Sequence, residues 1–143
     1  MKPIHILLVE DNEGDIVLTR EAFEDSRILI SMSVVKDGKR AIDFLSKEGE
    51  FSDQQLPDII LLDVNLPKRN GHEVLHYIKT NELLKQIPVI MLTTSSSATD
   101  INQSYKNYAN CFITKPVDVQ EFLNVVATIE KFWILIVKLP TAL

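Results

Sequence analysis

One stretch decides the fold: Asp58-Ile59-Ile60-Leu61-Leu62-Asp63-Val64-Asn65-Leu66-Pro67. Its apolar part, residues 59–62, is too short for a helix and does not alternate with polar residues. A continuous run of this kind is typical of a strand that is buried on both faces of a parallel sheet. Asp63 ends this predicted strand. A carboxylate at a buried position is costly unless something compensates its charge, so Asp63 is the first candidate for a functional residue.

The composition limits the classes of protein to consider. The 143 residues are about one domain's worth. Fifteen basic and twenty acidic residues give a net charge of −5, so no basic field attracts nucleic acid or an anionic membrane. The single cysteine, Cys111, cannot form an intrachain disulfide. The first residues lack the charged-then-apolar pattern of a secretion signal, and no apolar run reaches about 20 residues. We therefore expect a cytoplasmic protein without a nucleic-acid or membrane partner.

Strand-like and helix-like segments alternate along the rest of the chain. The predicted strands cover residues 4–9, 29–35, 59–62, 88–92 and 111–114, and the predicted helices begin near residues 12, 38, 71, 100 and 119. Residues 47–57 are polar and are predicted to form a surface loop. Alternation at this spacing favours an α/β fold with a parallel sheet and helices on both faces, because right-handed crossovers require that arrangement.

Polar residues follow the ends of four predicted strands: Glu10 and Asp11, then Asp63, Thr93 and Lys115. The carboxyl ends of parallel strands meet at one edge of the sheet, so these side chains are expected to converge. Three close carboxylates repel each other unless a cation is present. Oxygen ligands without histidine or cysteine suit Mg²⁺. A carboxylate flanked by a metal ion, an ammonium group and a hydroxyl can attack phosphorus, so Asp63 is the predicted nucleophile.

Each of these residues, taken alone, has a simpler explanation. A single acid at a strand end is more often a helix cap or a solvated turn residue than a nucleophile. Glu10 and Asp11 also fit first-turn acids, which the helix dipole favours. Thr93 alone is usually an ordinary β-branched strand residue, and Lys115 alone is usually a surface charge. Their joint position at four strand ends is what favours a functional site.

The chain resembles the receiver domain of two-component response regulators in four motifs: Val9-Glu10-Asp11-Asn12, Leu62-Asp63-Val64-Asn65-Leu66-Pro67 with Gly71 following, Leu92-Thr93-Thr94-Ser95, and Thr114-Lys115-Pro116. The resemblance covers nearly the whole chain. It implies a flavodoxin-like fold with five parallel strands in the order 2-1-3-4-5. It also implies that a histidine kinase passes a phosphoryl group to an aspartate of this chain.

The resemblance implies a role for each matched residue at the metal site. Asp63 matches the phosphoacceptor of the family. Glu10, Asp11, Asp63 and the backbone carbonyl of Asn65 match the groups that hold Mg²⁺.

The resemblance also covers the residues that surround the phosphoryl group. Thr93 matches the hydroxyl that follows this group, Lys115 matches the lysine that pairs with it, and the Lys115–Pro116 peptide bond is expected to be cis. Two positions depart from the family pattern. Phe112 keeps the ring of the aromatic switch position but has no hydroxyl, so a switch here must act through packing. Tyr108 stands where family members often carry glycine.

The end of the chain is more apolar than one covering helix requires. Only 28 residues follow Lys115, too few for an output domain, so we expect a stand-alone receiver domain over residues 1–130 and an apolar extension over residues 131–143. The predicted partner surface consists of Phe132, Trp133, Leu135 and Ile136. A homodimer is the commonest way to cover such a surface; the alternative is that the extension folds back over its own domain. The extension also resembles that of small response regulators paired with cyanobacterial phytochromes.

Three classes of function follow from these observations. The leading one is a phosphoaccepting receiver that is not an enzyme with an external substrate, and whose partner is a sensor histidine kinase, such as a phytochrome, or a phosphotransfer protein. The second is a pseudo-receiver that acts only as a protein-binding scaffold. The third is an aspartyl-nucleophile phosphatase of the haloacid-dehalogenase type. That type needs a second acid two residues after the nucleophile, where this chain has Asn65.

Overall fold

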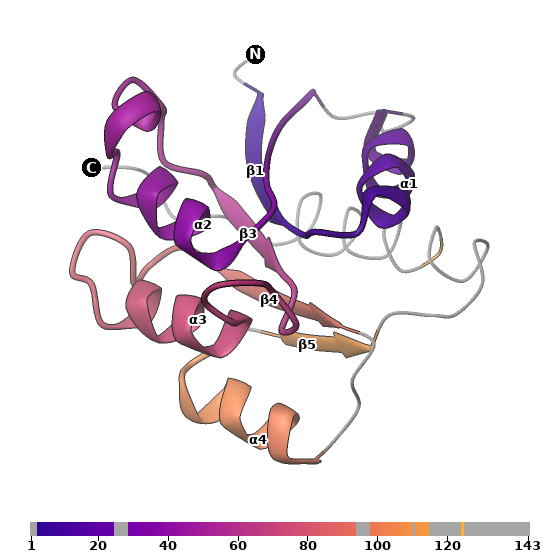
Figure 1. Ribbon diagram of the computed structural model, residues 1–143. Helices are drawn as coiled ribbons and strands as arrows, with labels where there is room; N and C mark the ends of the chain where they lie inside the picture. The colour runs from indigo at the N-terminus through magenta and orange to yellow at the C-terminus, as the bar shows by residue number, and fades with distance from the viewer. Residues whose placement is uncertain (1–2, 25–28, 94–97, 110, 115–123, 125–143) are drawn as a thin grey trace.

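The computed structural model describes residues 3–24, 29–93, 98–109, 111–114 and 124, and these form an α/β fold around a five-stranded sheet (Figure 1). The strands are β1 (Ile4–Val9), β2 (Ile30–Val35), β3 (Ile59–Leu62), β4 (Val89–Thr93) and β5 (Cys111–Thr114). All four neighbouring pairs are parallel, and the order is β2-β1-β3-β4-β5. The predicted flavodoxin-like topology is therefore confirmed.

The stretch that ends on Asp63 forms the central strand. β3 lies between β1 and β4, and each of its four residues is fully buried. The absence of alternation in the sequence follows from this position, because helices cover both faces of the strand. Each neighbouring strand also supplies a residue that reaches no solvent, such as Leu7 of β1 and Ile90 of β4.

The described α-helices are α1 (Glu13–Glu24), α2 (Gly38–Leu45), α3 (Gly71–Lys79) and α4 (Ala98–Lys106). Two of them begin at residues that cap free backbone N–H groups. The Asp37 carboxylate accepts from the Arg40 N–H at the start of α2, and Asn70 and Glu73 form a capping box at the start of α3. α3 ends at Lys79, and Thr80 caps it by donating both its N–H and its hydroxyl to the carbonyl of His76.

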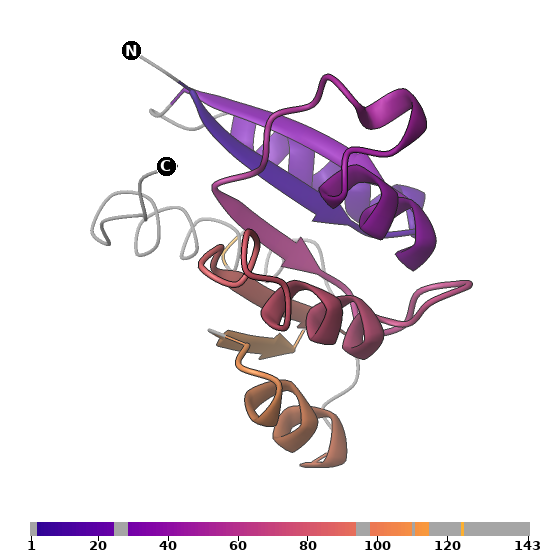
Figure 2. The same cartoon turned by 90° about the vertical axis from the view of Figure 1, so that its left-hand side faces the viewer.

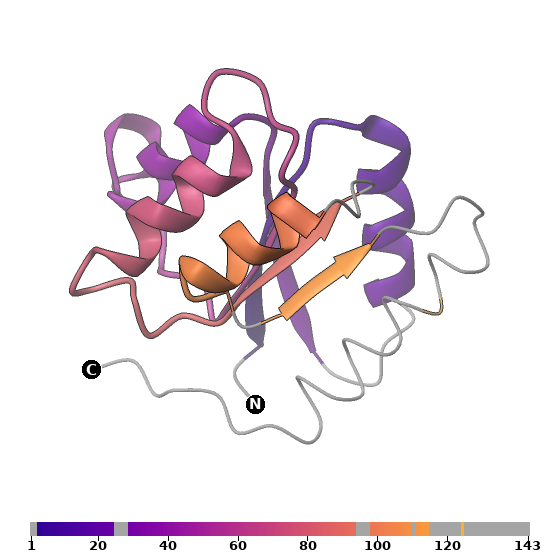
Figure 3. The same cartoon turned by 90° about the horizontal axis from the view of Figure 1, so that it is seen from below.

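The helices form two layers that enclose the sheet. α2 and α3 pack side by side along one face, as Figure 2 shows, and α4 continues this layer beyond α3. α1 covers the opposite face (Figure 3). Successive strand residues point to opposite faces, so the buried core divides into two clusters. Leu7, Ile60 and Met91 belong to the α2–α3 side, and Leu8, Leu61 and Ile90 belong to the α1 side.

Two sequence predictions about local structure need correction or comment. Residues 47–57 are not irregular throughout, because Gly49–Phe51 form a short 3-10 helix, η1. The Phe51 ring holds this segment against the core, 5.3 Å from the ring of Phe44 between centroids. Tyr108, which stands where family members often carry glycine, has a φ of 66° and so adopts the left-handed conformation that glycine prefers.

Some predictions fall on residues that the structure does not describe. The helix expected from residue 119, the extension over residues 131–143 and the Lys115–Pro116 peptide bond all lie outside the described residues. Among the helices that are described, none has the length and hydropathy of a membrane span.

His5 on β1 predicts a pH dependence of stability. Its backbone N–H donates to Asp58 Oδ2 at 2.8 Å, and the Nε2 of its ring lies 2.8 Å from Ser33 Oγ. Burial lowers the pKa of His5 below its ordinary 6.5, although the Asp58 charge and a hydrogen bond to Leu56 act in the opposite direction. The folded protein therefore binds fewer protons than the unfolded chain, so the contribution of His5 to stability is present above about pH 6.5 and is lost as the pH falls below it.

We expect the free energy of unfolding in urea to decrease between about pH 7.5 and 5.5, and the decrease to be smaller in His5→Gln than in the wild type. His76→Gln, on the exposed face of α3, is the matched control and should keep the wild-type pH dependence. Equal pH dependence in the wild type and His5→Gln would show that His5 does not contribute.

Candidate functional site

Three carboxylates meet where β1 and β3 end. One side-chain oxygen from each of Glu10, Asp11 and Asp63 lies within 4.8 Å of the other two. The register explains this convergence, because Val9 of β1 pairs with Leu62 of β3, so both strands end at the same level. The predicted convergence of these three acids is therefore present in the structure.

Two of these carboxylates are buried and accept backbone hydrogen bonds, whereas the third is exposed. Glu10 is 2 % exposed and Asp63 is 7 % exposed, whereas Asp11 lies at the surface. The N–H of Asn12 donates to Glu10 Oε1 at 3.1 Å, and the N–H of Asn65 donates to Asp63 Oδ1 at 3.0 Å. Each of these bonds holds one oxygen of a buried carboxylate in place.

The charge and chemistry of this cluster suit a divalent cation. Three carboxylates at this separation repel each other, and a bound cation converts the repulsion into attraction. All the ligand atoms are oxygen, which suits hard ions such as Mg²⁺ and Mn²⁺. Three protein ligands leave coordination positions for water or for a substrate oxygen. The residues present therefore fit a Mg²⁺ site of the kind that phosphoryl transfer uses.

Gly71 allows α3 to begin directly against the end of β3. Its N–H donates to the carbonyl of Val64 at 2.8 Å. A Cβ at position 71 would lie 2.2 Å from the carbonyl oxygen of Asp63 and 2.6 Å from the Cα of Val64. Only a residue without a side chain fits so close to the backbone of Asp63. The sequence motif included this glycine, but its contact with Asp63 appears only in three dimensions.

The other predicted site residues are described to different extents. The backbone of Thr93 ends β4, next to β3 in the sheet, while its side chain lies outside the described part of the protein. Phe112 of β5 is partly buried against the α2–α3 side of the core, and its N–H donates to the Tyr105 hydroxyl at 3.3 Å. The remaining predicted residues lie outside the described ranges: Lys115, Pro116, Phe132, Trp133, Leu135 and Ile136.

The sequence does not predict a contact of Asp37 and Gly38 with the loop that follows Asp63. The pair has only the composition of a turn before α2. In the structure it contacts the loop that follows Asp63, residues 64–70. A turn motif carries no information about which distant loop packs on it, so no sequence signal could have identified this contact.

Comparisons with known proteins agree with this geometry. The family model described as the response regulator receiver domain matches residues 6–127. The chain is 43 % identical over 140 residues to the response regulator Rcp1 of Synechocystis sp.. This aligned region covers 98 % of this chain and 95 % of that protein.

Two solved structures are also similar over almost the full length. The phosphorylated cyanobacterial phytochrome response regulator RcpA has a TM-score of 0.96 at 43 % identity, covering 98 % of this chain and 100 % of that one. The Mn²⁺-bound form of response regulator Rcp1 has a TM-score of 0.95 at 42 % identity, covering 97 % of this chain and 100 % of that one.

Proposed function

This chain belongs to the response regulator receiver family, and we propose that Asp63 accepts a phosphoryl group from a sensor histidine kinase or a phosphotransfer protein in a Mg²⁺-dependent reaction. The observation that carries the proposal is the convergence of Glu10, Asp11 and Asp63 within 4.8 Å at the carboxyl end of the sheet. Phosphorylation then changes the contacts that the protein makes with its partners. The protein has no external substrate that it turns over.

The transfer is a displacement at phosphorus. A carboxylate oxygen of Asp63 forms the new P–O bond, the P–N bond of the donor phosphohistidine breaks, and the neutral imidazole leaves after taking up a proton. The Asn65 N–H bond to Asp63 Oδ1 fixes the direction of the carboxylate before the reaction. Glu10 and Asp11, with the backbone carbonyl of Asn65, would hold Mg²⁺ beside it. The bound ion supplies positive charge to the phosphoryl oxygens.

Residues from the neighbouring strands complete the proposed site. We assign Thr93 to the transferred phosphoryl group as a hydroxyl donor and Lys115 as its positive partner. Phe112 is the proposed switch residue. It acts through packing, since its ring contacts the core and has no hydroxyl. A change of population between two existing arrangements would carry the signal from Thr93 to the face formed by α4 and β5.

Two of the similar structures support a kinase partner and a divalent metal ion for this chain. One relative is a phosphorylated phytochrome response regulator, and another was solved with Mn²⁺. We propose that a phytochrome-type histidine kinase is the donor for this chain and that Mg²⁺ is its physiological ion. The acidic net charge and the single cysteine support a cytoplasmic location and the absence of a nucleic-acid partner.

The apolar extension is the proposed dimerisation element. Residues 131–143 follow the proposed receiver domain, residues 1–130, and carry Phe132, Trp133, Leu135 and Ile136 in a run with few charges. Light scattering of the full chain and of a version truncated after Glu130 tests this assignment, because a monomeric full chain would contradict it.

The proposed chemistry predicts a metal-dependent adduct. We expect the protein to gain the mass of one phosphoryl group on incubation with acetyl phosphate and Mg²⁺, and to gain none when a chelator is present. Asp11→Asn keeps the side-chain shape and removes one ligand charge, so it should raise the Mg²⁺ concentration for half-maximal adduct formation by about ten- to a hundred-fold. Intact-mass spectrometry at a series of Mg²⁺ concentrations measures both results.

Asp15→Asn is the matched control for Asp11→Asn, because Asp15 lies in the first turn of α1 and outside the carboxylate cluster. It should keep the wild-type Mg²⁺ dependence. A wild type that forms no adduct would contradict the phosphoacceptor proposal and favour a scaffold.

A further inference from the structure

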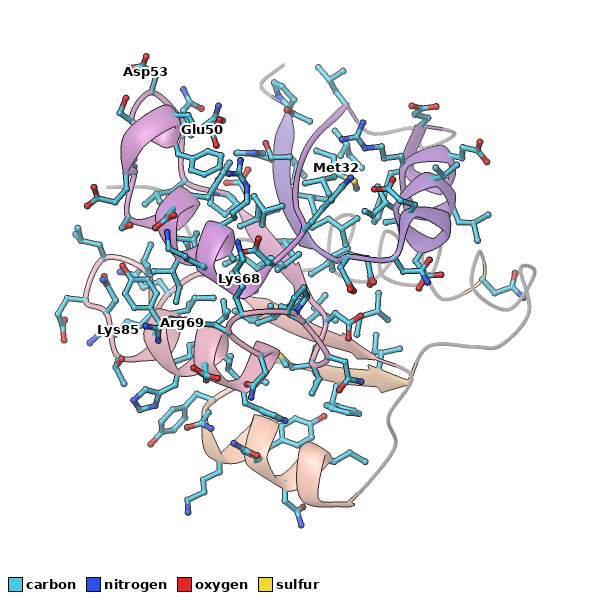
Figure 4. All side chains as sticks on the ribbon, in the orientation of Figure 1. Met32, Glu50, Asp53, Lys68, Arg69 and Lys85 are labelled. Atoms are coloured by element: carbon cyan, nitrogen blue, oxygen red, sulfur yellow. The ribbon has the colours of Figure 1, made fainter. Side chains whose placement is uncertain are left out.

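The turn between β2 and α2 packs on the loop that follows Asp63, which we call the acceptor loop (residues 64–70). The Gly38 N–H donates to the carbonyl of Pro67 at 3.3 Å. A Cβ at position 38 would lie only 1.9 Å from the carbonyl oxygen of Arg69. Figure 4 shows Lys68 and Arg69 beside α2. Two backbones therefore meet here at a distance that only glycine permits.

Asp37 divides its two carboxylate oxygens between the helix and the acceptor loop. The residue is 8 % exposed. Its Oδ1 accepts from the Arg40 N–H at 2.7 Å and so caps α2. Its Oδ2 lies 3.7 Å from the Nζ of Lys68. The charge of Asp37 therefore serves a second purpose, which a neutral capping residue could not serve.

Lys68 has a φ of 67°. Residues other than glycine, asparagine and aspartate rarely adopt this left-handed backbone conformation. Such a conformation persists only where the surroundings determine it. The surroundings here are the contacts of the preceding and following residues, Pro67 and Arg69, with the start of α2.

The acceptor loop is also bonded to the phosphoacceptor at its other end. The Asn65 N–H donates to Asp63 Oδ1, and the Gly71 N–H donates to the Val64 carbonyl. A displacement of residues 67–69 therefore moves the same loop that orients the Asp63 carboxylate.

We propose that Asp37 and Gly38 are positioning residues that latch the acceptor loop in the geometry needed at Asp63. The Asp37–Lys68 ion pair and the Gly38–Pro67 and Gly38–Arg69 backbone contacts form the latch. Its effect on phosphorylation rests on the proposed function of Asp63, whereas its effect on the loop does not. The latch makes the start of α2 a part of the proposed phosphorylation site, although Asp37 and Gly38 are not among the three residues of the carboxylate cluster.

Hydrogen–deuterium exchange of the metal-free protein tests the latch without reference to phosphorylation. Asp37→Asn keeps the capping oxygen and removes the charge. We expect amide exchange within residues 64–69 to become about two- to five-fold faster, because a partly exposed ion pair such as Asp37–Lys68 contributes only modestly to stability. Exchange in α2 should stay at the wild-type rate. The matched control is Asp43→Asn on the same helix, whose carboxylate pairs with Lys39 and not with the loop. It should leave the loop unchanged.

Two outcomes of this experiment would overturn the proposal. Unchanged exchange in the acceptor loop of Asp37→Asn would show that the Asp37 charge does not hold this loop in place. Faster exchange in α2 to the same degree as in the loop would show that Asp37 acts only as a helix cap. Lys68→Met should reproduce the effect, and the double variant should be no faster than either single one, since both remove the same pair.

Gly38→Ala tests the backbone contact. The added methyl group cannot fit against Arg69, so we expect exchange in residues 64–69 to rise by at least about ten-fold. Gly49→Ala, at a position with φ of 55° and no atom within 4 Å of the added Cβ, is the control for replacing a glycine elsewhere. If Gly38→Ala does not fold, the Asp37→Asn result decides the proposal alone.

A phosphorylation measurement separates the latch from the proposed function. If the wild type forms the acetyl phosphate adduct, Asp37→Asn should raise the half-maximal Mg²⁺ concentration more than it lowers the rate at saturating Mg²⁺, because the loop carries the Asn65 carbonyl. An equal effect on the half-maximal Mg²⁺ concentration and on the rate at saturating Mg²⁺ would overturn a positioning role at the metal. If the wild type forms no adduct, the proposed function fails while the exchange experiment still decides the latch.

Discussion

Asp63→Asn is expected to remove the phosphoryl adduct, with a fall in the rate of at least about a thousand-fold. Asparagine has nearly the same shape, and its oxygen can still accept the Asn65 N–H, so the fold should be kept. The amide oxygen carries no charge and is a poor nucleophile towards phosphorus. Intact-mass spectrometry after incubation with acetyl phosphate and Mg²⁺ measures the loss.

The same substitution should not destabilise the metal-free protein. Removing one of three neighbouring carboxylate charges relieves their repulsion, so we expect the free energy of unfolding to stay level or to rise by up to about 1 kcal/mol. Asp58→Asn is the matched control, because Asp58 precedes the same strand and its carboxylate binds the His5 N–H at the other end. That variant should still form the adduct. An adduct of wild-type yield on Asp63→Asn would show that another residue is the acceptor.

Gly71→Ala is expected to destabilise the protein by about 2–4 kcal/mol. Alanine in the first turn of a helix would ordinarily stabilise it by up to about 1 kcal/mol relative to glycine, so the sign of the effect is informative. Here the Cβ would lie 2.2 Å from the carbonyl oxygen of Asp63, so α3 must move away from the end of β3. The midpoint of urea unfolding measures the loss of stability, and the adduct yield of the folded fraction measures displacement of Asp63.

The control for Gly71→Ala is another glycine in a helix. A Cβ at Gly14 of α1 meets only the Asn12 side-chain oxygen at 3.3 Å, and a flexible side chain can move by a few tenths of an ångström. Gly14→Ala should therefore be close to neutral. A stabilised Gly71→Ala variant would contradict the close approach of α3 to the end of β3.

The parts of the structure that follow from periodicity and topology were predictable from the sequence. Buried parallel strands appear as continuous apolar runs, so β3 and its neighbours were identified, and the polar residues at their ends identified Glu10, Asp11 and Asp63. The short helix at Phe51 was missed because it depends on the packing of one aromatic ring on Phe44, which local sequence does not encode.

The contacts between distant loops were not predictable from the sequence. Asp37-Gly38 has the composition of an ordinary turn, and Lys68 has no sequence property that indicates a left-handed backbone. Their relation depends on the three-dimensional distance between two loops that are about thirty residues apart in the chain. The predicted roles of Thr93 and Lys115 remain predictions, since the described part of the structure includes neither side chain.

The register of β1 and β3 limits how the length of this chain can vary. Val9 pairs with Leu62, and the carboxylates of Glu10 and Asp63 meet only because both strands end at that level. An insertion of a single residue inside either strand would turn every following side chain to the opposite face and move one acid away from the others. An insertion of several residues between Lys47 and Gln55 would leave this alignment unchanged, because that segment lies outside the sheet. Changes in length are therefore tolerable in the connections and not in the strands, and the proposed chemistry depends on residue counts as much as on residue identities.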